Sequence, residues 1–487
     1  MGGTRLRVDA TGVALVAMCA LVVAVALFGG QRITGVLPID VIIVGAPLVI
    51  LLGIPFLRRG GLPSLPGNGV WAPGLLFLFT GVASALAHRV DADVIMTIFR
   101  YATYLALMVF VGALAADQGR RRIICWTWAA AAAATVGVAV VWYVRTYSAA
   151  IKAAAELGGS VPQTAIRVES TFINSNFYAE FLVLSIGVGL YLMAAPRRGE
   201  RIIAWAFTGL VAITLVLTYT RGSWLGLFVA LALAALMVNP RYLLFLIGLP
   251  VIAVMFVPGV TNRIAQALTL EGSAGFRTKL WMIAGAAVAD RPIFGWGLGR
   301  FYEAFASVVD RRPGLSVGFA AYGAHNSYLT LAAEAGIVCA VAFIWLIWRL
   351  GRISTSESLR AEAPRRRRLR AAALGVGLLA FALNGLTSNS FQHPQAAIFF
   401  WILAGILIGL HREQTADAPA ADRVPSSLNR MFAGSWTESL LRPAAASFGR
   451  VLSASRVGSL LRTPPPSERG LVEGSWTLQK ALGTGRP

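Results

Sequence analysis

Three basic residues, Arg221, Arg277 and His325, carry the most informative chemistry in a sequence that is otherwise strongly apolar. Each lies at the edge of an apolar run or in the segment between two such runs, where charge is costly and therefore informative. A guanidinium offers a planar fork of donors that fits phosphate oxygens, and a neutral imidazole accepts a proton from a hydroxyl. The set suits a reaction in which arginines hold a leaving diphosphate while the histidine deprotonates an incoming hydroxyl.

His325 begins the segment "HNSYLTLAAEAGI", in which Asn326 and Ser327 can cap a helix that starts immediately afterwards. The positive end of the helix dipole lowers the pKa of a nearby imidazole, which favours a neutral ring and general-base chemistry. The alternative is a helix-capping segment without a chemical role. Asn326 is also a candidate for substrate binding. Glu334 lies about half a turn away around the helix, so we expect it to pack against a neighbouring helix.

Arg221 lies in the tight turn "TYTRGSW" between two apolar runs, and Gly222 beside it would let a ligand approach the backbone closely. The alternative for Arg221 is an arginine that reaches from a helix end to the membrane surface. Arg277 lies at the start of an amphipathic helix predicted over residues 276–289. Trp281 follows one turn later on the same face and is a candidate for substrate binding.

Two further arginines are candidates for substrate binding. Arg100 lies inside an apolar run, about two turns from its predicted outer end. Arg291 precedes Pro292 at the end of the amphipathic helix, and the glycines of "GWGLG" (295–299) follow. A nucleotide-binding fingerprint is a weak interpretation of these glycines because no strand precedes them. We predict instead a loop that folds back against the end of a helix.

The elements that position these residues are predicted to be membrane helices. The chain has 487 residues, of which 57% are hydrophobic and only 13% charged, and this composition indicates an all-α polytopic membrane protein. About twelve apolar runs reach spanning length: 11–30, 38–57, 70–88, 94–116, 122–145, 176–195, 201–219, 222–239, 241–258, 326–349, 371–389 and 395–411.

Arginines in the short connecting segments predict the orientation of these helices. Alternate segments are rich in arginine, including 120–122, 197–201 and 365–370, and such segments face the cytoplasm. Both termini are then cytoplasmic. We attribute the net charge of +21 to arginines that set the orientation of the helices and contact lipid headgroups. We therefore expect no nucleic-acid partner.

The expected organisation has five parts. A cytoplasmic N-terminus (1–10) precedes nine helices (11–258), and a long outer loop (259–325) contains the amphipathic helix. Three helices (326–411) and a largely disordered cytoplasmic tail (412–487) complete the chain.

Metal and cofactor chemistry is not predicted. The three cysteines, Cys19, Cys125 and Cys339, all lie in apolar runs, so neither a disulfide framework nor a zinc site is indicated. The outer acids are scattered, and the HExxH motif is absent from the sequence. The GxSxG pattern of serine hydrolases is also absent.

Five segments together resemble the bacterial O-antigen ligase and O-antigen polymerase family. They are "STFINSNFYAEFLV" (170–183), "TYTRGSWLG" (218–226), "RTKLW" (277–281), "PIFGWGLGRF" (292–301) and "AHNSYLTLAAEAGI" (324–337). The resemblance covers roughly residues 165–350.

The resemblance implies a GT-C-like membrane glycosyltransferase of about twelve helices in the bacterial inner membrane, with a periplasmic active site. It implies metal-independent, inverting transfer of a glycan from undecaprenyl diphosphate to a lipid or glycan acceptor, as in lipopolysaccharide biosynthesis. By position, Arg221 and Arg277 match the family's donor-diphosphate arginines, and His325 matches its acceptor-activating histidine. Arg100 and Arg291 do not come from this match; they are included as substrate-binding candidates because of their expected burial and their charge alone.

Three alternatives remain open at this point. A polysaccharide polymerase of the same family would use the same residues. An enzyme similar to the peptidoglycan polymerases would use an outer aspartate as base, where this chain offers His325. A flippase or other transporter of lipid-linked oligosaccharides would need a hydrated path lined by charges, and many transporters contain an internal repeat that this sequence lacks.

Overall fold

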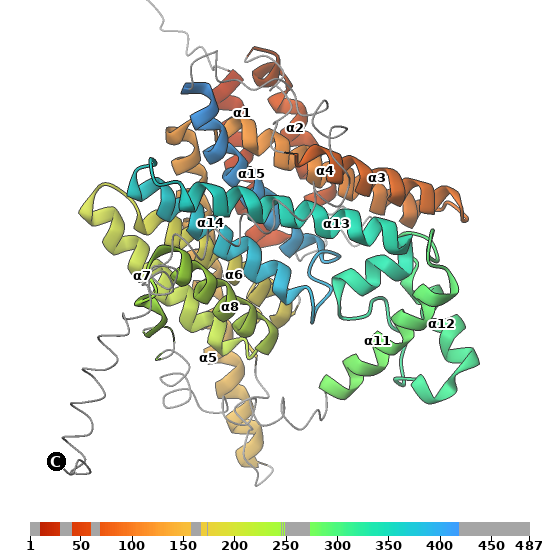
Figure 1. The fold of residues 1–487 in the computed structure, drawn as a ribbon. Helices are drawn as coiled ribbons and strands as arrows, with labels where there is room; N and C mark the ends of the chain where they lie inside the picture. Colours follow the sequence, from red (N-terminus) through yellow and green to blue (C-terminus); the bar gives the residue numbers. More distant parts are fainter. Residues whose placement is uncertain are drawn as a thin grey trace, which may run out of the picture.

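The computed structural model describes residues 10–29, 41–59, 69–156, 167–172, 174–244, 246, 248 and 273–417, and the regular elements in these ranges are helices. Figure 1 shows them as one bundle with α11 and α12 at one side. The helices are α1 (Ala10–Phe28), α2 (Val41–Arg59), α3 (Trp71–Leu86), α4 (Ala92–Leu114), α5 (Gln118–Glu156), α6 (Ser175–Met193), α7 (Arg198–Leu217), α8 (Arg221–Val238), α11 (Ser273–Asp290), α12 (Phe301–Arg311), η2 (Pro313–Leu315), α13 (Ser327–Leu359), α14 (Arg365–Asn384) and α15 (Pro394–Asp417).

Eight of the described helices are long and apolar enough to cross a membrane, namely α1, α4, α5, α6, α7, α8, α13 and α15. Shorter apolar helices lie within α2 and α3. Eleven of the twelve predicted spans fall on helices, while the predicted span 241–258 lies mostly outside the described residues. The chain is therefore a polytopic membrane protein, and its described part is all-α as predicted.

The centre of the bundle is formed by α15, α6 and α14. In the most apolar stretch of α15, 89% of the residues are buried, against 22% for α8, so α15 is a central helix and α8 a peripheral one. Small residues allow the central helices to approach closely: a Cβ added to Gly187 of α6 would lie 2.9 Å from the Cα of Gly377 on α14. Close backbone approach of this kind is the usual way in which membrane helices associate.

The glycine-rich loop after α11 inserts into a break in α13. At Gly336 the backbone adopts φ 85° and ψ 167°, so the helix is interrupted there. The freed groups bond to the loop: Ile337 N donates to Pro292 O at 2.9 Å, and Trp296 N donates to Ala333 O at 2.9 Å. The interpretation of "GWGLG" as a loop that folds back against a helix is confirmed.

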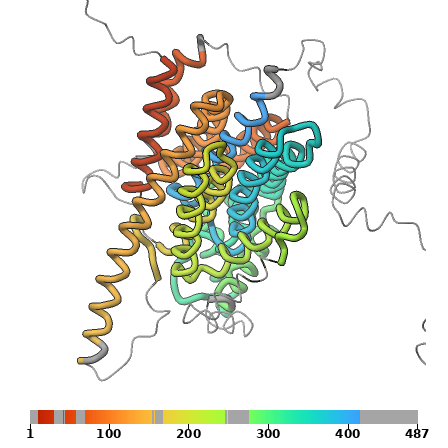
Figure 2. Tube along the Cα trace, turned by 90° about the vertical axis from the view of Figure 1, so that its left-hand side faces the viewer, coloured from red at the N-terminus to blue at the C-terminus, as the bar shows by residue number. Residues whose placement is uncertain are grey.

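Two helical features differ from the predicted boundaries. The helix expected at 122–145 continues to Glu156, and Figure 2 shows α5 extending beyond its neighbours. A second helix, α12, follows the amphipathic helix in the segment predicted as outer loop. Its apolar side packs on α11, which hides its hydrophobic face from water.

Candidate functional site

Arg221 is the first residue of α8 and follows a turn that is held from several sides. Tyr219 in this turn has φ 50°, a left-handed conformation that is uncommon for a bulky residue. Arg167 braces the turn, because its Nε donates to Thr218 O at 2.9 Å and its Nη2 donates to Thr220 Oγ1 at 2.9 Å. The position of Arg221 is therefore fixed by neighbouring side chains as well as by helix geometry.

The prediction that a ligand approaches the backbone at Gly222 is wrong. A Cβ at Gly222 would overlap Thr387 Oγ1 and lie 2.8 Å from Asn384 Oδ1 at the end of α14. Ser223 continues this contact by donating to Asn384 Oδ1 at 3.2 Å. The glycine is needed for close packing of α8 on α14.

Arg277 on α11 lies beside Arg221 although the two are far apart in sequence. Burial, and then repulsion from Arg221, lower the pKa of Arg277 below its usual value. Within the described part of the chain, no carboxylate pairs with Arg277. Two adjacent guanidiniums that repel each other form a site that an anion would stabilise.

His325 lies near Arg277, two residues before the start of α13, in a left-handed backbone conformation with φ 49°. Its ring meets that of Phe276 edge to face, with 5.5 Å between centroids. Burial, and then the charge of Arg277, lower the pKa of His325 below its ordinary value. The expected neutral ring is therefore supported, with burial and Arg277 as its causes.

The segment around His325 is fastened to the connection between α14 and α15. Asn326 Oδ1 accepts hydrogen bonds from the N–H groups of Tyr328 and Leu329, both at 3.0 Å, and so caps α13. Ser327 N donates to Gly385 O at 2.7 Å. The predicted capping by Asn326 is confirmed, and these bonds show how a strained conformation at His325 is maintained.

A second imidazole, that of His393, lies close to His325, an approach that the sequence did not predict. Its ring is packed against Phe177, with 3.7 Å between centroids. Burial, and then the proximity of His325 and Arg100, lower the pKa of His393 to about 3. His393 therefore joins the cluster as a neutral ring, and Arg100 of α4 belongs to the same cluster.

Arg100 completes the group of cations near the two histidines. Its Nε is buried and, among the described residues, has no hydrogen-bond partner. Glu334 lies within electrostatic range of Arg100, but its carboxylate also accepts hydrogen bonds from the backbone N–H groups of Gly299 and Phe301. Glu334 thus holds the glycine-rich loop and the start of α12, in agreement with the prediction that it does not orient His325.

The remaining candidates are placed differently. Arg291 stacks on Trp296, with its guanidinium carbon 4.0 Å from the ring centroid, and its Nη1 lies 3.2 Å from His88 Nε2. Trp281 is 37% exposed on α11. The structure thus brings Arg100, Arg221, Arg277 and His325 together, with Asn326 as the adjacent cap, whereas the described contacts of Arg291 and Trp281 lie outside this cluster.

A buried polar network lies beneath Arg221. Oε1 of Glu180, on α6, accepts hydrogen bonds from Asn384 Nδ2 at 3.0 Å, Ser388 Oγ at 2.7 Å and Ser390 Oγ at 2.8 Å. Asn384 also accepts from Ser223, so Glu180 supports the start of α8. Glu180 is a lone acid within an apolar run, and this is the sequence signal that marks it as informative.

The described residues contain no group of three or more His, Cys, Asp or Glu that could hold a metal ion. The fold and the cluster together define a membrane protein with a cationic site, built from two facing arginines and a neutral histidine. A family model for O-antigen ligases matches residues 206–344, a range that contains Arg221, Arg277 and His325. This part of the chain is therefore similar to the O-antigen ligases, in agreement with the resemblance to O-antigen ligases and polymerases seen in the sequence. None of the curated proteins matches the chain.

Proposed function

We propose that the protein transfers a polysaccharide from undecaprenyl diphosphate to an acceptor hydroxyl, as an inverting and metal-independent O-antigen ligase. The observation that carries this proposal is the approach of Arg221 and Arg277, which repel each other and are not balanced by a described carboxylate at Arg277. A diphosphate would supply the missing negative charge and accept hydrogen bonds from both guanidinium forks.

The reaction follows from the positions of the three residues. The acceptor oxygen attacks the anomeric carbon of the donor sugar, and the new glycosidic bond forms as the bond from that carbon to the diphosphate oxygen breaks. His325 takes the hydroxyl proton, which requires the neutral ring that its lowered pKa provides. The diphosphate leaves with the bonding electron pair, and Arg221 and Arg277 stabilise its charge. Attack from the face opposite the leaving group inverts the anomeric configuration.

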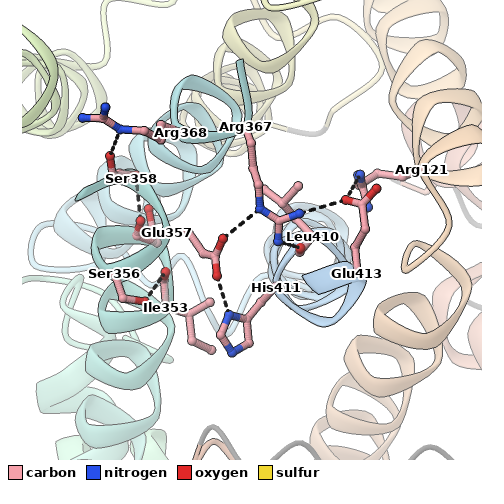
Figure 3. A network of polar contacts seen from close by, with 11 residues as sticks. Arg121, Ile353, Ser356, Glu357, Ser358, Arg367, Arg368, Leu410, His411 and Glu413 are labelled. Carbon is pink, nitrogen blue, oxygen red and sulfur yellow. Dashed lines mark hydrogen bonds and ion pairs between the residues drawn. The ribbon is translucent and has the colours of Figure 1, made fainter. Parts of the chain in front are cut away.

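The arrangement of charges supports an extracytoplasmic position for this site. Arg121 and Arg367, from two of the segments predicted to face the cytoplasm, meet at one carboxylate, that of Glu413 (Figure 3). Arg367 lies in the first turn of α14, and the other end of this helix is Asn384, near Arg221. The arginine-rich end and the cluster around His325 thus lie at opposite ends of α14, which fits an inner-membrane protein with both termini in the cytoplasm.

The test uses purified protein, a lipid-linked glycan and an acceptor saccharide or lipid. We expect release of undecaprenyl diphosphate and formation of a glycosylated acceptor without ATP, and equal rates with and without a chelator. Elongation of the lipid-linked glycan in place of acceptor glycosylation would assign polymerase activity instead. Movement of the intact donor between leaflets without cleavage would contradict the proposal and indicate a flippase.

A further inference from the structure

A pocket with a volume of about 270 Å³ lies at the end of the bundle that is remote from His325. It is bounded by the start of α5, the turn between α6 and α7, the first turns of α14 and the end of α15. Arg370, in this pocket, and Asn384, near Arg221, are fourteen residues apart on α14. That separation corresponds to about 20 Å along the helix, so the pocket is distinct from the site described above.

One of the arginines that line the pocket is fully paired. Arg367 donates from Nε to Glu357 Oε2 at 3.0 Å and from Nη1 to Glu413 Oε2 at 3.2 Å (Figure 3). Glu413 also accepts from Arg121, and Glu357 also contacts His411. The ion pairs of these two acids are thus with Arg121, Arg367 and His411.

Two other lining arginines, Arg366 and Arg370, have no acidic partner among the described residues. Arg370 lies with its guanidinium carbon 5.3 Å from the centroid of the Tyr191 ring, and its Nη2 donates weakly to Ala194 O at 3.4 Å. Its Nε is buried without a described hydrogen-bond partner. The pocket thus combines an excess of positive charge with an unused donor.

The size and position of the pocket indicate which kind of anion it can bind. About 270 Å³ equals the volume of roughly nine liquid waters, which suits a phosphate group with its immediate substituents. Guanidinium forks match phosphate oxygens, and basic pockets between membrane helices are suited to lipid headgroups. We propose that this pocket binds the phosphodiester headgroup of an anionic phospholipid through Arg366 and Arg370.

The first experiment uses the unaltered full-length protein, delipidated in neutral detergent. Phosphatidylglycerol, phosphatidylcholine and inorganic phosphate are added separately, and retention of lipid is measured by native mass spectrometry while unfolding is followed by heating. We expect phosphatidylglycerol to be retained and to raise the unfolding midpoint, with phosphatidylcholine having little effect. Equal retention of both lipids would overturn the proposal. Protection by inorganic phosphate equal to that by phosphatidylglycerol would also overturn it, because the site would then recognise a free ion.

The second experiment compares the double variant Arg366→Gln, Arg370→Gln with Arg365→Gln. Arg365 is exposed, begins the same helix and does not line the pocket, so its variant removes one positive charge outside the proposed site. We expect affinity for phosphatidylglycerol to fall roughly tenfold or more in the double variant, because two charge-assisted contacts are lost. The Arg365 variant should bind as the parent does. Equal loss in both variants, or no loss in a folded double variant, would overturn the assignment.

Discussion

His325 combines three properties that are each uncommon: a left-handed backbone, a partly buried ring and a neighbouring guanidinium that disfavours its protonation. Non-glycine residues with positive φ cost free energy and persist where the surroundings hold them. Here the holding groups are the cap at Asn326 and the bond from Ser327 to Gly385. In the proposed function, the strained backbone serves to hold a neutral imidazole near the arginine pair.

Substitution of His325 by alanine should remove transfer while retaining the donor. We expect the rate to fall by roughly 100-fold or more, which is the usual contribution of a general base. Donor binding, measured with a labelled lipid diphosphate, should stay within about twofold because the arginines remain. His88→Gln is the matched control, since His88 contacts Arg291 outside the cluster. Loss of donor binding in His325→Ala would instead assign a diphosphate-binding role to the ring.

Replacement of Arg277 by lysine should impair transfer even though the charge is kept. A lysine is a point charge and cannot offer the two parallel donors that a guanidinium presents to phosphate oxygens. We expect kcat/KM for the lipid-linked donor to fall at least about tenfold, the effect of losing one charge-assisted hydrogen bond. Steady-state kinetics with purified protein measures this value. A lysine variant as active as the parent would contradict a bidentate contact at Arg277.

The pH dependence of transfer should report the coupling between Arg277 and His325. Because the pKa of His325 is lowered, the acid limb of activity should lie below the ordinary histidine value. Arg277→Gln removes the repulsion that disfavours the imidazolium, so the acid limb of the residual activity should move to higher pH. A pH–rate profile of kcat/KM measures this shift. An unmoved limb would mean that burial alone sets the pKa.

At the scale of elements, the break in α13 is the feature that joins the bundle to its outer helices. The conformation of Gly336, φ 85° and ψ 167°, lies in a region that is essentially restricted to glycine. A Cβ there would also overlap the carbonyl of Ile293 in the inserted loop. The same loop connects α11 to α12. The break in α13 therefore determines the position of α11 and of Arg277.

The variant Gly336→Ala should therefore destabilise the protein and reduce transfer. We expect a loss of roughly 2–4 kcal/mol in unfolding free energy, from backbone strain together with displacement of the loop. Gly351→Ala is the matched control on the same helix, because a Cβ at Gly351 has open space around it and alanine favours helix. Thermal unfolding in detergent compares the two. An alanine at 336 that melts with the parent would show that the interruption is not required.

The helices and the principal cluster could be predicted from sequence because they depend on local signals. Apolar runs mark the spans, and the cap at Asn326 is encoded by the residues that follow it. The break at Gly336 could not be predicted, because a glycine within an apolar run is equally compatible with a continuous helix. The approach of His393 to His325 could not be predicted, because it depends on how α15 packs, which leaves no trace in residue spacing. Gly222 was misread for the same reason, since its neighbour on α14 is distant in sequence.

At the scale of the whole molecule, polar chemistry is divided between the two ends of the bundle. One end gathers Arg221, Arg277 and His325, and the other gathers the ionic network of Arg121, Glu413 and Arg367. The network joins helices α5, α13, α14 and α15 (Figure 3). This division predicts that stability and chemistry can be altered separately.

Substitution of Glu357 by glutamine tests that separation. Glu357 is only 2% exposed and accepts from both Arg367 and His411, so removal of its charge leaves two buried donors poorly compensated. We expect the unfolding midpoint to fall, with a loss of about 2 kcal/mol or more, while kcat of the folded fraction is unchanged because the cluster at the far end is untouched. Glu362→Gln, at an exposed position in the turn before α14, is the control and should melt with the parent. A loss of kcat in folded Glu357→Gln protein would show that the two ends are coupled through α13 and α14.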